Sequence, residues 1–78
     1  MIFVDRIETD PEILLGKPVI RGTRIAVSFL LEALTSMSID EILAAYPFLT
    51  RDDVEAALRY AALVVDSREG DGASEVSS

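Results

Sequence analysis

The chain has 78 residues, half of them hydrophobic, a net charge of −7, and neither cysteine nor histidine. This length and composition predict one small folded domain. The missing residue types exclude disulfides, thiolate nucleophiles, imidazole bases and the usual zinc, copper or haem ligands, and the lack of a long apolar run or signal peptide predicts a cytoplasmic protein without a membrane span.

Two short strands are predicted near the N-terminus. Residues 2–7 are mostly β-branched or aromatic, which predicts a strand or an extended arm. A second candidate strand, Val19-Ile20, lies between the turn-forming residues 16–18 and 21–23. We expect the two strands to pair, either within one chain or between chains.

From Val27 onward, apolar residues recur at the three- and four-residue spacing of a helix. Apolar residues recur on one face from Val27 to Leu34, which predicts a first helix. Ser38 and Glu41 stand three residues apart before an apolar run, the pattern of a capping box at the start of a second helix. That helix is expected to end before Pro47.

The third predicted helix is the longest. Thr50 is expected to cap it, with Asp53 as the partner in a second capping box. From Val54 to Val65 apolar residues recur at three- and four-residue spacing, which indicates an amphipathic helix. After Asp66 there is almost nothing to bury, so we predict a domain over residues 1–66 and a disordered tail over residues 67–78.

The charge of the chain is unevenly distributed. Through Ala26 there are four basic and four acidic residues, whereas the later residues carry the whole negative excess. Lys17, Arg21 and Arg24 form a local positive cluster in a loop with Gly and Pro. Such side chains could hold phosphates or the carboxylates of a partner; solvated loop charge is the alternative.

The second and third predicted helices, joined by a short link, match a helix-turn-helix. In that motif the later helix enters a DNA major groove, and its candidate contacts here are Thr50, Arg51 and Arg59. Asp52 and Asp53 lie in the same turn and would repel a DNA phosphate, although their negative charge interacts favourably with the dipole at a helix N-terminus. A plain three-helix core without a ligand explains the pattern equally well.

The end of the third helix is apolar nearly all round, from Ala61 to Val65. A helix of this kind is usually buried on every side, and so small a chain needs a partner helix or a second subunit to bury it. Leu63, Val64 and Val65 are therefore the candidate partner-binding residues. Simple exposure of these side chains is the alternative.

Catalysis is not predicted. The carboxylates that could be grouped as a metal or acid–base site each have a capping, turn or surface explanation. We expect no enzymatic activity, no metal, no cofactor and no small-molecule substrate. The carboxylates considered for a metal or acid–base site are Asp5, Asp10, Asp40, Asp52 and Asp53.

Three sequence elements resemble those of a known prokaryotic family, the domain of unknown function 433, in the same order and spacing. They are Gly16-Lys17-Pro18, Arg21-Gly22-Thr23-Arg24 and Tyr46-Pro47-Phe48-Leu49-Thr50. The resemblance extends from Ile7 to about Ala62. Leu15 stands where the family commonly has a second Gly, and Ala26 where it commonly has a Pro.

The resemblance implies a mainly α fold: a three-helix, homeodomain-like helix-turn-helix core preceded by a short strand or hairpin. It also implies an antitoxin of a type II toxin–antitoxin module that dimerises and neutralises a PIN-like ribonuclease toxin. Operator DNA is a second candidate partner, through repression of its own promoter. The alternative is a stand-alone protein-interaction module with a helix-turn-helix shape and no DNA binding.

Overall fold

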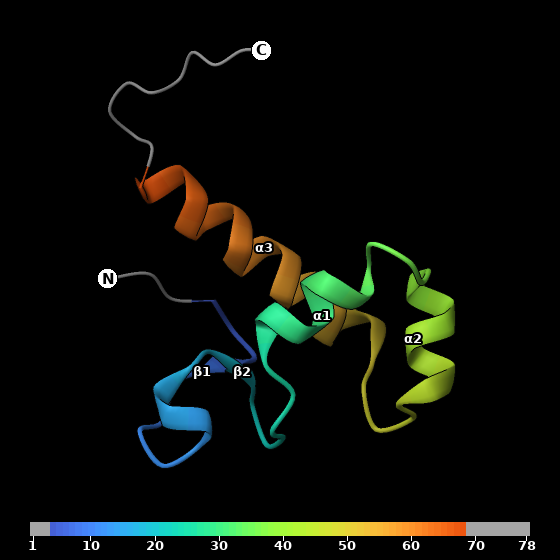
Figure 1. The fold of residues 1–78 in the computed structure, drawn as a ribbon, viewed down its shortest axis with the longest axis horizontal. Coiled ribbons are helices and arrows are strands. Elements are labelled where there is room, and N and C mark those ends of the chain that lie inside the picture. The colour runs from blue at the N-terminus through green and yellow to red at the C-terminus, as the bar shows by residue number, and fades with distance from the viewer. Residues whose placement is uncertain (1–3, 69–78) are drawn as a thin grey trace.

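The computed structural model describes residues 4–68 of the chain. In chain order it contains strand β1 (Ile7–Glu8), a short 3-10 helix (Leu14–Gly16), strand β2 (Val19–Ile20) and three helices, α1 (Val27–Ala33), α2 (Ile39–Ala45) and α3 (Arg51–Arg68). Figure 1 shows the hairpin and α1 on one side of α3, with α2 beyond its N-terminal end. The predicted fold class, three helices preceded by a hairpin, is confirmed.

The hairpin is shorter and later than the sequence predicts. Strands β1 and β2 pair antiparallel, with Ile7 opposite Ile20 and Glu8 opposite Val19. The predicted strand over residues 2–7 is wrong at Val4, Asp5 and Arg6, where the chain turns, and right at Ile7, which belongs to β1. Arg6 adopts a φ of 78°, which interrupts an extended run, and residues 2 and 3 lie outside the described part.

The loop after β2 closes on the hydroxyl of Thr23. This oxygen donates a hydrogen bond to the carbonyl of Ile20 at 2.7 Å and accepts one from the N–H of Ile25 at 2.9 Å. Gly22 supplies the φ of 81° that the turn requires. The Arg-Gly-Thr-Arg element therefore has a local structural reason, which is to bring the chain back alongside β2 before α1.

Both predicted capping boxes are present. At the start of α2 the side chain of Ser38 accepts from the N–H of Glu41 at 3.1 Å, and the Glu41 carboxylate accepts from the N–H of Ser38 at 2.9 Å. At the start of α3 the reciprocal bonds of Thr50 and Asp53 measure 3.0 and 3.2 Å. Helix α2 ends at Ala45, before Pro47, as predicted.

The boundary predicted at Asp66 is two residues too early. Ser67 and Arg68 still belong to α3, which has 18 residues. Terminal turns of a helix are set by backbone hydrogen bonds that apolar patterning does not report. The rest of the predicted disordered tail, residues 69–78, lies outside the described residues.

The core forms where the hairpin, α1 and α2 all meet the first half of α3. Its most completely buried large side chains come one or two from each element. Helix α1 has 7 residues, so it covers only part of α3, and Figure 1 shows the C-terminal half of α3 extending past it. The five most completely buried large side chains of the core are Val19, Ile20, Leu30, Ile42 and Val54.

Candidate protein-binding site

An apolar groove of about 460 Å³ lies where the C-terminal half of α3 passes the start of α1. One wall comes from α3, the other from α1, and the residues before β2 form an end. The groove is lined by Lys17, Pro18, Val27, Ser28, Leu31, Tyr60, Ala61, Val64 and Val65.

The α3 wall continues the face of the helix that forms the core. Ala57, Ala61 and Val64 are spaced by four and three residues, so they share one face. Ala57 is completely buried, Ala61 and Val64 are partly buried, and Val65 is 51% exposed. Burial thus declines along one apolar face as its covering helix ends, which leaves a helix surface of core character that residues 4–67 cover only in part.

Two of the three predicted partner-binding residues line this groove, and the third does not. Val64 and Val65 are part of the α3 wall. Leu63 lies outside the lining and is 41% exposed. Two positions along a helix correspond to about 200° of rotation, so Leu63 and Val65 point to nearly opposite sides of α3.

The groove has one charged side chain in its lining, Lys17. It is exposed, and no ion pair joins it to any other residue of the range 4–68. Its neighbour Pro18 is partly buried and fixes the backbone at this end of the groove. The site therefore combines apolar walls with a single uncommitted positive charge at the rim.

A second hollow, of about 530 Å³, lies between the Thr23 loop and the turn that links α2 to α3. Phe48 and Arg24 are exposed beside it. Because Lys17 lines the groove and Arg24 lines this hollow, the structure separates two members of the predicted positive cluster. The hollow is lined by Ile13, Gly22, Thr23, Arg24, Ile25 and Phe48.

The other predicted DNA-contacting residues have mixed settings. Arg21 pairs with Asp5 at 3.5 Å, and Arg51 pairs with Asp40 of α2. Thr50 is committed to the cap of α3 through its hydroxyl. Arg59 is exposed on α3. Two of the five predicted basic side chains, Arg21 and Arg51, are therefore already paired with carboxylates of the same chain.

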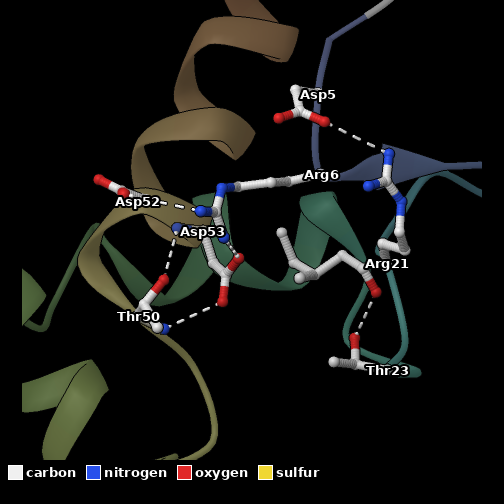
Figure 2. A network of polar contacts seen from close by, with 8 residues as sticks. Asp5, Arg6, Arg21, Thr23, Thr50, Asp52 and Asp53 are labelled. Atoms are coloured by element: carbon white, nitrogen blue, oxygen red, sulfur yellow. Dashed lines mark hydrogen bonds and ion pairs between the residues drawn. The ribbon is translucent and has the colours of Figure 1, made fainter.

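Arg6, which no sequence pattern singles out, carries the most buried ion pair among the described residues. Figure 2 shows its guanidinium between Asp52 and Asp53 at the start of α3. The N–O distances are 2.9 Å to Asp53 and 3.7 Å to Asp52. The backbone carbonyl of Arg6 also accepts the N–H of Arg21 at 2.8 Å, so this residue joins the hairpin to α3.

No sequence signal indicates this pair, because Arg6 and Asp53 are 47 residues apart. Asp53 is the only charged residue among the buried ones in the range 4–67, and both of its carboxylate oxygens accept hydrogen bonds. One oxygen accepts from Arg6 and the other from the N–H of Thr50. The structural explanation of Asp53 is thereby confirmed and extended.

Residues 4–68 contain no group of three or more acidic, cysteine or histidine side chains placed to hold a metal ion. None of their helices combines the length and apolar character needed to cross a membrane.

Comparison with known proteins gives a family and a structural relative. A family model described as "Protein of unknown function (DUF433)" matches residues 7–61. A crystal structure of a DUF433 member protein from Anabaena variabilis ATCC 29413 is 29% identical, with a TM-score of 0.70 over 86% of this chain and 67% of that one. No curated protein sequence matches. Since the family model spans more than half of its residues, the chain belongs to the DUF433 family of proteins of unknown function.

Proposed function

We propose that this protein is a non-enzymatic antitoxin of a type II toxin–antitoxin module, which neutralises a PIN-like ribonuclease by binding it directly. The supporting observation is the groove between α1 and α3, where residues 4–67 cover an apolar face of core character only in part. Complete burial of a side chain such as valine stabilises a complex by about 1.5–3 kcal/mol. A few side chains of this kind are enough to anchor a protein partner.

The charge of the chain supports a nuclease as the partner. A protein that binds RNA presents positive charge to its substrate, and this chain carries a net charge of −7. Opposite net charges accelerate association and disfavour wrong partners. The acid-rich second half of the chain, which includes α3, would then approach the positive surface that the RNA otherwise occupies.

Co-expression with the reading frame encoded beside this gene tests the proposal. We expect a PIN-like ribonuclease to copurify with the chain and to lose RNA cleavage in the complex. Val65→Asp is expected to abolish copurification, because it places a carboxylate in the apolar groove. Leu63→Asp, the same change on the opposite side of α3, is the matched control and should copurify normally.

Failure of copurification with a folded wild-type chain would contradict the antitoxin proposal, as would a neighbour that is not a nuclease. Equal loss in both variants would instead indicate a general effect on α3. Circular dichroism of each variant detects such an effect as a loss of helix. Both positions are well exposed, so we expect neither change to unfold the domain.

Repression of its own promoter is proposed as a second role, exercised as a homodimer. The alternative of a protein-interaction module without DNA binding is supported by the ion pairs that occupy Arg21 and Arg51 and by Asp52 in the first turn of α3. Fluorescence anisotropy against the upstream region distinguishes the two roles, since DNA binding must weaken steeply with salt. Light scattering after size exclusion tests the homodimer.

A further inference from the structure

We infer that the groove between α1 and α3 binds an amphipathic helix of the partner, with a carboxylate placed to pair with Lys17. This inference rests on the proposed function and specifies the partner segment.

The walls of the groove favour a helix. Both long walls are helix surfaces, α1 through Val27 and Leu31 and α3 through Ala61 and Val64. A third helix packs into such a groove with side chains at three- and four-residue spacing. Ala61 and Val64 of the α3 wall are only partly buried, so side chains of a docked helix can contact them.

The backbone at the end of the groove disfavours an added strand. Strand addition requires free N–H and C=O groups along an edge. Here the N–H of Lys17 donates to the carbonyl of Leu14 at 3.2 Å, Pro18 has no N–H, and the carbonyl of Pro18 accepts from Val27 at 2.9 Å. Val19 is also occupied on both sides, by Glu8 in β1 and by a bridge to Ala26.

Lys17 determines the charge expected of the occupant. It is the one charged residue in the lining, and it makes no ion pair with residues 4–68. A carboxylate on the docked helix would pair with it, whereas a basic side chain there would be repelled. The expected segment is therefore an apolar stripe with an acidic residue at one end.

Charge also favours a different protein over a second copy of this chain. All of the net negative charge arises after Ala26, and the α3 wall belongs to that acid-rich half. Two copies joined groove to groove would bring those halves together. A partner with net positive charge gains attraction from the same arrangement.

The test measures the affinity of the copurified nuclease for purified variants of the full chain. Val65→Asp should weaken binding by about 100-fold and Leu63→Asp by less than about 2-fold, because only the first enters the groove. Lys17→Glu should weaken binding by about 10-fold. Arg24→Glu makes the same charge change in the other hollow and should stay within about 2-fold of the wild type.

A photo-crosslinking side chain at Val65 identifies the occupant directly. Mass spectrometry should place the crosslinks on one nuclease segment, at positions three, four and seven residues apart beside an Asp or Glu. Crosslinks at alternate residues would indicate a strand, and crosslinks to a second copy would indicate a dimer interface; either result overturns the inference.

The failures of the two proposals are distinguishable. A tight complex that tolerates both Val65→Asp and Lys17→Glu overturns the groove inference and leaves the antitoxin proposal standing. The absence of any complex between folded, purified proteins overturns both. If Val65→Asp converts a dimeric wild type into a monomer, the groove belongs to the homodimer and the inference is wrong.

Discussion

The ion pair between Arg6 and Asp53 should contribute measurably to stability, and a double-mutant cycle can isolate its contribution. The cycle compares Arg6→Ala, Asp53→Ala and the double variant with the wild type. Asp53→Ala also removes one half of the capping box with Thr50, but that loss occurs with and without Arg6. It therefore cancels from the coupling energy, which reports the ion pair alone.

The structure sets the expected magnitudes. Asp53→Ala keeps the Thr50 hydroxyl as the cap and loses only the hydrogen bond from the Thr50 N–H, which costs about 1 kcal/mol. A hydrogen bond between charged groups contributes about 1.5–3 kcal/mol when well shielded, but the Arg6 side chain is 42% exposed while that of Asp53 is 12% exposed. Solvent screening reduces the pair to about 1 kcal/mol of coupling, and Asp53→Ala should cost about 2 kcal/mol in all.

Urea denaturation followed by circular dichroism measures each free energy of unfolding. The pair of Arg51 and Asp40 is the matched control, because its N–O contact is shorter while its side chains are 52% and 83% exposed. Its coupling should be about 0.3 kcal/mol. If the two coupling energies are equal, burial does not determine the strength of these pairs and the reasoning is refuted.

Three further predictions concern local structure and use the same denaturation assay. Ser38→Ala should cost about 1 kcal/mol by removing the α2 cap, and an unchanged midpoint would show that the capping box contributes nothing. Leu30→Ala should cost about 2–5 kcal/mol because the side chain is completely buried; retention of full stability would contradict its core position. Leu15→Gly should stabilise the fold by up to about 1 kcal/mol, since Leu15 has a φ of 59° and is 93% exposed, whereas Leu15→Ala, which keeps the strain, should not.

The candidate site could be predicted only in part. Its apolar residues Val64 and Val65 were identified because a helix that is apolar nearly all round must be buried by something outside so short a chain. The same pattern includes Leu63, but the structure places Leu63 outside the groove. The groove itself depends on how far α1 covers α3, which no pattern in either helix specifies.

The sequence by itself determined the three helices and where α2 and α3 begin. Ser38 with Glu41 and Thr50 with Asp53 form their capping bonds across three residues, so neighbouring side chains are sufficient to specify them. The apolar spacing of α3 likewise depends only on the order of its own residues. Each of these features can be read from residues within one segment, and the structure confirms them.

Only the tertiary structure decided which residues meet across long separations. Arg6 turns the chain where a strand was expected and pairs with Asp53, 47 residues away. The same packing separates Lys17 from Arg24, although they are close in sequence, and places them at different hollows. Such contacts arise from the joint packing of several elements, and a pattern within one segment carries no record of the surface it will meet.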